Sequence, residues 1–136
     1  MKLLAIDHGT RRTGLAVSDE TGLLARPLVV IERVGSPAGM TDLLEVIGTE
    51  APDLVIVGLP RTPSGEEGEQ AQAVRAFVGR LRRACPAPIE LVDERLTTRI
   101  AAARGGRAAE DARAAAVLLQ GVLDARRPTM PRQADG

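Results

Sequence analysis

The chain is organised around residues 2–17, KLLAIDHGTRRTGLAV. Its first apolar run, residues 3–6, is uninterrupted, as expected of a strand buried on both faces. Asp7 ends this strand, and a carboxylate there is costly to bury unless something cationic satisfies it. Gly9 and Gly14 are predicted to bracket a tight turn, since glycine accepts a positive φ at no steric cost. A second apolar run then completes a β-hairpin that presents Asp7 and several backbone N–H groups at one edge of a sheet.

Three further strands are expected, at residues 23–31, 54–57 and 89–92. Pro27 favours an edge position or a bulge in the first of them. Helical segments separate the later strands, which are therefore expected to run parallel to the first strand. The sequence predicts one α/β domain with a five-stranded mixed sheet, antiparallel through strands 1-2-3, parallel through strands 1-4-5 and flanked by helices. This domain is expected over residues 1–127, followed by a disordered tail at 128–136.

Helix signals fill the intervals between the strands. Ser36-Pro37 predicts a helix start, with serine as N-cap and proline at the first helical position. Gly48 and Pro52 are expected to end that helix. Ser64-Gly65-Glu66-Glu67 matches a capping box before a second helix, with Phe77 at the border of its buried face. Two more helices are expected, one from Leu96-Thr97-Thr98 that Gly105-Gly106 interrupts, and one from about Ala109 to Arg126.

Composition narrows the possible functions. Phe77 is the only aromatic residue, so a function based on stacking bases against aromatic rings is nearly excluded. The formal net charge is zero, but all of the basic residues except Lys2 are arginine, whose planar guanidinium grips phosphate in a bidentate way. Cys85 is the only cysteine, which excludes an internal disulfide framework and a cysteine metal site. No apolar stretch approaches a membrane span and no signal-peptide pattern is present, so a cytoplasmic location is expected.

Three acidic residues are predicted to converge. Asp7 ends the first strand and Glu94, or Asp93 beside it, ends the last; parallel strands bring these ends to one edge of the sheet. Asp111 is expected in the first turn of the final helix, at a spacing from Ala114, Ala115 and Leu118 that puts it on the sheet-facing stripe. Taken alone, each acid fits a helix cap or a solvated strand end. Together they favour divalent cations held by oxygen ligands, and two such ions are the usual device for in-line attack at a phosphodiester.

Five motifs, spread over nearly the whole chain, resemble the bacterial YqgF family, also called RuvX. They are DHGTRRTGLA (7–16), VGLP (57–60), GxxGxQA (65–71), VDERLTT (92–98) and DxxAAxxLLQ (111–120). The resemblance implies a ribonuclease H-like fold and a hydrolase acting on ester bonds, namely an endo- or exonuclease that requires Mg²⁺ or Mn²⁺ at a two-metal site. The family is described as a Holliday junction resolvase and as a nuclease that matures the 5′ end of 16S ribosomal RNA.

By the same resemblance, Asp7, Glu94 and Asp111 form the acidic triad, both catalytic and metal-binding. Two departures are visible. The segment between Thr98 and Asp111 is shorter and poorer in lysine than in many relatives. In the RuvC resolvases an acid ends the fourth strand, whereas here that strand ends in Gly58-Leu59-Pro60, and Glu94 comes from the fifth.

Nucleic-acid contacts are expected from two segments beside the acids. The first is the hairpin turn and the second follows the last strand; their residues are Thr10, Arg11 and Arg12, then Arg95, Thr97, Thr98 and Arg99. Arg11 and Arg12 either clamp a phosphate or are merely solvated, and Arg95 either holds Glu94 or contacts the scissile strand. The expected partner is structured RNA, branched DNA or both, recognised by shape and backbone. His8 should point to the face opposite Asp7 and is interpreted as structural.

Other interpretations remain open. A non-catalytic protein that binds RNA or the ribosome and retains the fold is the main alternative. The Asp-x-Gly-Thr hairpin also resembles the phosphate-binding hairpin of actin-like ATPases and sugar kinases, but those enzymes need two such lobes and this chain holds one. A four-way junction has approximate two-fold symmetry, so a weak homodimer, or a monomer that pairs on its substrate, is expected.

Overall fold

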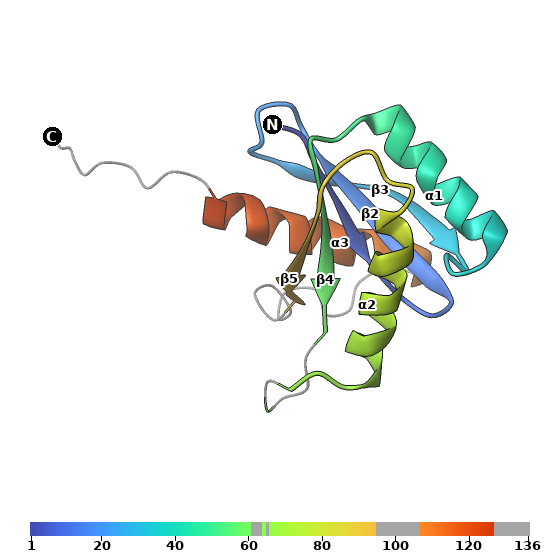
Figure 1. Cartoon of the computed structure of the whole chain (residues 1–136). Helices are drawn as coiled ribbons and strands as arrows, with labels where there is room; N and C mark the ends of the chain where they lie inside the picture. The colour runs from blue at the N-terminus through green and yellow to red at the C-terminus, as the bar shows by residue number, and fades with distance from the viewer. Residues whose placement is uncertain (61–63, 65, 95–106, 127–136) are drawn as a thin grey trace, which may run out of the picture.

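The computed structural model describes residues 1–60, 64, 66–94 and 107–126, with only the backbone at 107–110. The helix expected from Leu96 and the tail expected at 128–136 lie outside these residues. At the centre is a five-stranded sheet of order β3-β2-β1-β4-β5 (Figure 1). The strands are β1 (Leu3–Asp7), β2 (Arg12–Ser18), β3 (Ala25–Glu32), β4 (Leu54–Leu59) and β5 (Ile89–Asp93).

Strand directions in this sheet are those the sequence predicts. β1 pairs antiparallel with β2, and β2 antiparallel with β3. β1 pairs parallel with β4, and β4 parallel with β5. Pro27 lies in β3, which is an edge strand and also carries a register shift: Leu15 faces Val29 whereas Ala16 faces Pro27. The edge position expected for this proline is therefore confirmed, and the pairing is irregular beside it.

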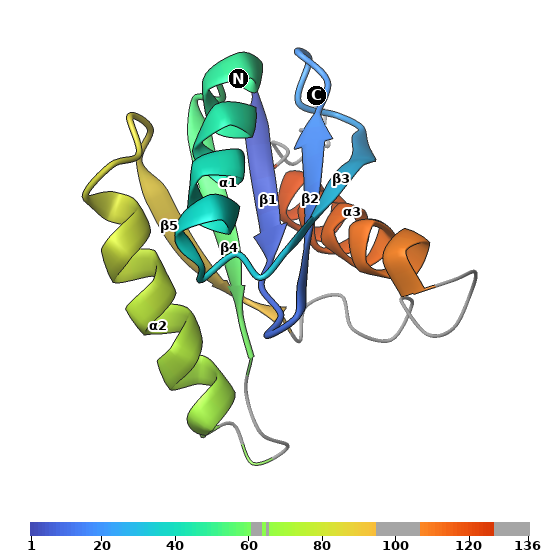
Figure 2. The same ribbon diagram turned by 90° about the vertical axis from the view of Figure 1, so that its right-hand side faces the viewer.

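Helices cover both faces of the sheet (Figure 2). The helices α1 (Pro37–Glu50) and α2 (Glu69–Arg82) lie on one face and α3 (Arg107–Arg126) on the other. Alternation along β1 serves both layers: Leu4 and Ile6 join the core under α1 and α2, whereas Leu3 and Ala5 join the core under α3. All four side chains are buried, which explains the unbroken apolar run. None of the helices in the described part of the chain is long and apolar enough to cross a membrane.

The hairpin glycines are required for space and not for a positive φ, which corrects the sequence prediction. Gly14 lies inside β2, paired with Asp7. Among the described glycines only Gly22 has a positive φ. A Cβ at Gly9 would collide with the carbonyl of Arg12, and one at Gly14 with the backbone carbonyl of Asp111. Glycine thus permits close approach of backbones, within the turn and between β2 and α3.

Helix boundaries differ from the predictions in three places. Ser36 caps α1 as predicted, since its hydroxyl accepts from the Gly39 N–H at 3.0 Å. However, α1 continues through Gly48 to Glu50, and its C-cap is Ala51, which adopts the left-handed conformation. The capping box before α2 is wrong: the helix begins at Glu69 after Gly68, which makes no side-chain cap hydrogen bond. Phe77 lies inside the core rather than at its border.

The last helix begins two residues earlier than predicted, at Arg107. Asp111 therefore lies in its second turn and not its first. The predicted buried stripe is otherwise present, at Ala115, Leu118, Val122 and Leu123. Ala114 is only half-buried, because Ala112, Ala116 and Leu119 take part of the surface facing the sheet.

Candidate active site

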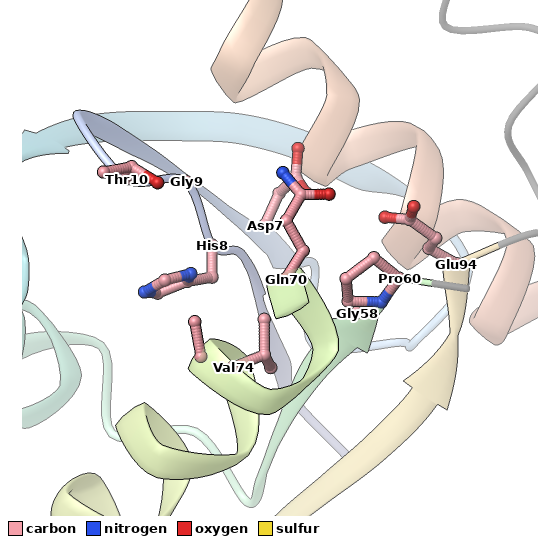
Figure 3. Close-up of a pocket in the computed structure, with 10 residues that line it drawn as sticks. Asp7, His8, Gly9, Thr10, Gly58, Pro60, Gln70, Val74 and Glu94 are labelled. Carbon is pink, nitrogen blue, oxygen red and sulfur yellow. The ribbon is translucent and has the colours of Figure 1, made fainter. Parts of the chain in front are cut away.

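A pocket of about 220 Å³ opens at the carboxyl ends of β1 and β4, beside the start of α2 (Figure 3). Parallel strands place the ends of β1, β4 and β5 at this same edge of the sheet. The side chains and backbone that line the pocket come from all of these elements: Asp7, His8, Gly9, Thr10, Gly58, Pro60, Gln70, Ala73, Val74 and Glu94.

Asp7 is the most electrostatically perturbed group of the pocket. It ends β1 and continues the alternation that points Leu3 and Ala5 toward α3. Burial and, to a smaller extent, the negative charges of Glu94 and Asp111 together raise the pKa of Asp7 to about 6. A carboxylate perturbed by desolvation and by two like charges is typical of functional sites.

Glu94 follows β5 directly and shares the pocket with Asp7. Burial raises the pKa of Glu94, and the charge of Asp93 adds to this shift. Figure 3 shows the carboxyl groups of Asp7 and Glu94 at the same side of the pocket, under α3. Of the two acids that the sequence offers at this strand end, Glu94 is thus the one that lines the pocket.

Asp111 approaches from α3, on the side of the hairpin. Its Oδ2 accepts a hydrogen bond from Nε of Arg12 at 3.0 Å. The close approach of Gly14 holds the Asp111 backbone directly against β2. Asp111 is close enough to Asp7 for its charge to act on that carboxyl, yet its own carboxylate is engaged with an arginine.

His8 lies on the face opposite Asp7, as the alternation predicts. Its ring packs against Phe77 of α2 with centroids 4.7 Å apart. Burial lowers the pKa of His8, and the charge of Arg80 lowers it further. The imidazole is therefore neutral near pH 7, although it still forms part of the pocket wall.

The hairpin turn is fixed by a threonine. The hydroxyl of Thr13, which is fully buried, accepts from the N–H of Gly9 at 3.2 Å and lies 3.3 Å from its carbonyl oxygen. This arrangement leaves Thr10 and Arg11 exposed at the tip. Arg12 instead points to Asp111, so the two arginines of the turn have different surroundings. The remaining predicted nucleic-acid contacts lie outside the described residues: Arg95, Thr97, Thr98 and Arg99.

Two site residues were not singled out from the sequence. Gln70, in the first turn of α2, extends toward Asp7 (Figure 3). Gly58 lies near the end of β4, where a Cβ would come within 3.0 Å of the Leu118 side chain and 3.6 Å of the Glu94 Cβ. Gly58 lies in the VGLP motif and Gln70 in the GxxGxQA motif, so these motifs are the sequence signal that could have identified the two residues. Nothing in the sequence showed that they face the acids.

The donor set suits a hard divalent cation. Carboxylate oxygens are what Mg²⁺ and Mn²⁺ prefer, and the acids repel one another without a positive charge between them. Within the described residues, no three His, Cys, Asp or Glu side chains are gathered closely enough to hold a metal as they stand. In the predicted triad, the carboxylate of Asp111 accepts a hydrogen bond from Arg12.

Comparison with solved structures places the fold in a known class. The RuvC structure from Thermus thermophilus superimposes with a TM-score of 0.57 at 21% identity, covering 93% of this chain and 96% of that one. The same protein in complex with a Holliday junction substrate gives a TM-score of 0.57 at 22% identity, covering 93% and 95%. The fold is thus that of the ribonuclease H-like resolvases, as the sequence predicts.

Sequence comparison identifies the family. A family model described as "RuvX: Holliday junction resolvase" matches residues 1–125. A relative from Thermobifida fusca (strain YX) is 43% identical over 93% of this chain and 89% of its own length. Another, from Anaeromyxobacter dehalogenans (strain 2CP-C), is 39% identical over 94% of this chain and 100% of its own. Both carry the name "Putative pre-16S rRNA nuclease". The chain belongs to the RuvX family of nucleases.

Proposed function

We propose that the protein is a divalent-metal-dependent nuclease that hydrolyses phosphodiester bonds in structured nucleic acid. One observation carries the proposal: burial and two neighbouring carboxylates raise the pKa of Asp7 to about 6, in a pocket at the carboxyl ends of parallel strands. Half-buried acids that repel one another are stabilised by a positive partner. Lys2 does not supply it, because it lies before the other end of β1 and pairs with Glu50 at 2.9 Å.

The proposed roles follow from the donor set. Asp7, Glu94 and Asp111 would hold Mg²⁺ or Mn²⁺, which when bound supplies an activated water and charge stabilisation for the leaving oxygen. The chain itself contributes the positions of the three carboxylates. β1 and β5 fix two of them at the strand ends, and the contact between Gly14 and the Asp111 backbone fixes the third.

The proposed substrates are those that the family and its relatives are named for: the 5′ end of pre-16S ribosomal RNA, a Holliday junction, or both. Phe77, the only Phe, Tyr or Trp residue, is fully buried, so none of these rings is available to stack on a base. Recognition would therefore rest on shape and backbone, through Thr10 and Arg11 at the exposed tip and the segment after β5. We also propose that the protein acts in the cytoplasm and pairs weakly as a homodimer on a junction, where two symmetric cuts are needed.

Cleavage of two labelled substrates tests the proposal: a four-way DNA junction and a precursor RNA that extends beyond the mature 16S 5′ end. Each is incubated with Mg²⁺, with Mn²⁺ or with EDTA. The wild-type protein should cut at least one of them only when a metal is present, and Asp7→Asn should not. Asp42→Asn is the matched control, because Asp42 is exposed on α1. Binding of either substrate without any cleavage would favour the non-catalytic alternative.

A further inference from the structure

The ion pair between Arg12 and Asp111 joins two parts of the site that are far apart in the chain. Arg12 begins β2 and Asp111 lies on α3, ninety-nine residues later. The contact is a hydrogen bond from Nε of Arg12 to Oδ2 of Asp111 at 3.0 Å. The side chains are 27% and 34% exposed. A partly exposed ion pair of this kind contributes little stability and is readily exchanged for another partner.

The backbones on either side of this pair are fixed. Gly14 and Arg12 lie two residues apart on β2, so they share a face of the strand. Gly14 packs so closely against the carbonyl of Asp111 that even a methyl group would not fit between them. The two backbones are therefore in direct contact beside the ion pair. A change of partner at Asp111 needs only a rotation of the side chains, with this contact kept.

We infer that Arg12 is the counter-ion of Asp111 in the metal-free protein, and that it is released toward a substrate phosphate when a divalent cation takes the Asp111 carboxylate. The inference rests on the proposed function, because it requires Asp111 to be a metal ligand.

The chemistry of the exchange is simple charge replacement. Without metal, the three acids repel one another, and Arg12 neutralises one of them. A divalent cation held by the same carboxylate would repel the guanidinium of Arg12, whose N–H donors would then be available to a phosphate. The planar fork of arginine matches phosphate geometry. Metal binding and nucleic-acid binding are thereby coupled, and by linkage each should tighten the other.

A double-mutant cycle without metal tests the restraint on Arg12. Binding to a short DNA duplex in EDTA is measured as a function of salt concentration. Asp111→Asn should release Arg12 and tighten binding. Arg12→Gln should then have little effect in the wild-type background, but in the Asp111→Asn background it should weaken binding and flatten the salt slope by roughly one unit. Arg11→Gln is the matched control, because it removes the neighbouring charge and should act equally in both backgrounds. An equal effect of Arg12→Gln in both backgrounds would overturn the inference.

Mn²⁺ titration, followed by calorimetry, tests the exchange itself. Arg12→Gln should bind Mn²⁺ about two- to fivefold more tightly than wild type, the range expected on removing a partly exposed ion pair. Arg11→Gln should shift the affinity less. Weaker Mn²⁺ binding by Arg12→Gln, with Arg12→Lys restoring it, would show that Arg12 positions Asp111 for the metal and would overturn the release. If the wild-type protein binds no Mn²⁺, the proposed function is contradicted as well. If Arg12→Gln binds Mn²⁺ with the same affinity as the wild-type protein, only the inference is overturned.

Discussion

Acidic side chains lie at both ends of β1, but their surroundings differ. At the amino end, Lys2 bonds to Glu50 through its ammonium group at 2.9 Å, and its backbone N–H bonds to Asp53 at 2.8 Å. At the carboxyl end, Asp7 is half-buried beside two other acids, and partial burial together with their charges raises its pKa to about 6. The first end satisfies its acids within the fold. The second holds like charges together at a cost in stability, which is what a site for a cation requires.

The largest expected effect is on cleavage. Asp7→Asn, Glu94→Gln and Asp111→Asn should each lower the rate by more than the roughly 10–100-fold that loss of an outer-shell partner costs. Glu50→Gln, at the other end of β1, should leave the rate unchanged. Initial rates on the better of the two labelled substrates measure this. If Asp111→Asn cleaves at the wild-type rate, Asp111 is not a member of the triad, and its neighbour Glu110 becomes the candidate for the third acid.

A smaller effect is expected in the pH dependence of stability without metal. The folded pKa of Asp7, about 6, lies above its ordinary value of 3.8, so the folded state binds the proton more tightly. The free energy of unfolding should therefore fall by at most about 3 kcal/mol as pH rises from about 4 to about 6, and should level off above that. In urea unfolding with EDTA, the free energy of unfolding of Asp7→Asn should increase relative to that of wild type as pH rises through this window. An increase of the wild-type value relative to that of Asp7→Asn would contradict the repulsion between the acids.

Part of this contrast was predictable from the sequence. The burial of β1 and the convergence of strand ends follow from local patterns: an unbroken apolar run, and helices between later strands. Those patterns sufficed for the sheet order and for the placement of Asp7, but they left Asp93 and Glu94 as alternatives at the end of the last strand. The Arg12–Asp111 pair was not predictable, because it joins residues ninety-nine positions apart and depends on how α3 crosses β2.

The errors have the same origin. The sequence predicts a turn at Gly14, but glycine has two uses, positive φ and close approach, and only the packed structure shows which one applies. The Ser64–Glu67 segment matched a capping box, yet α2 begins beyond it, at Glu69. Phe77 was placed at the border of its helix, whereas packing against His8 and the sheet buries it completely. For Gly14 and Phe77, tertiary contacts overrode a local signal.

Two glycines sharpen the contrast between a constrained and an unconstrained backbone. Gly14→Ala should destabilise the protein by about 1–3 kcal/mol, because the added methyl group collides with Asp111. Gly48→Ala should stabilise it by about 0.5–1 kcal/mol, since Gly48 is inside α1 with nothing within 4 Å of an added Cβ. Urea unfolding of both variants measures the difference. A neutral Gly14→Ala would mean that α3 can move away from β2.

The smallest expected effect concerns the exposed arginine of the hairpin. Arg11→Ala should weaken binding to duplex DNA alike for all sequences and flatten the salt slope by roughly one unit, since one phosphate contact is lost. Glu20→Ala, an exposed acid beyond the other end of β2, should leave the slope unchanged. Fluorescence anisotropy over a salt series measures both. An unaltered slope for Arg11→Ala would move the binding surface to the arginines of α2 (Arg75, Arg80 and Arg82).

The most direct measurement is the effect of Mn²⁺ on the free energy of unfolding of wild type, Asp7→Asn and Glu50→Gln. A cation that binds only the folded state stabilises it by about 2.7 kcal/mol at one hundred times its dissociation constant. Wild type and Glu50→Gln should gain this stability equally with rising Mn²⁺, and Asp7→Asn should gain little or none. Equal stabilisation of all three proteins, or of none, would contradict a cation site at the carboxyl end of β1.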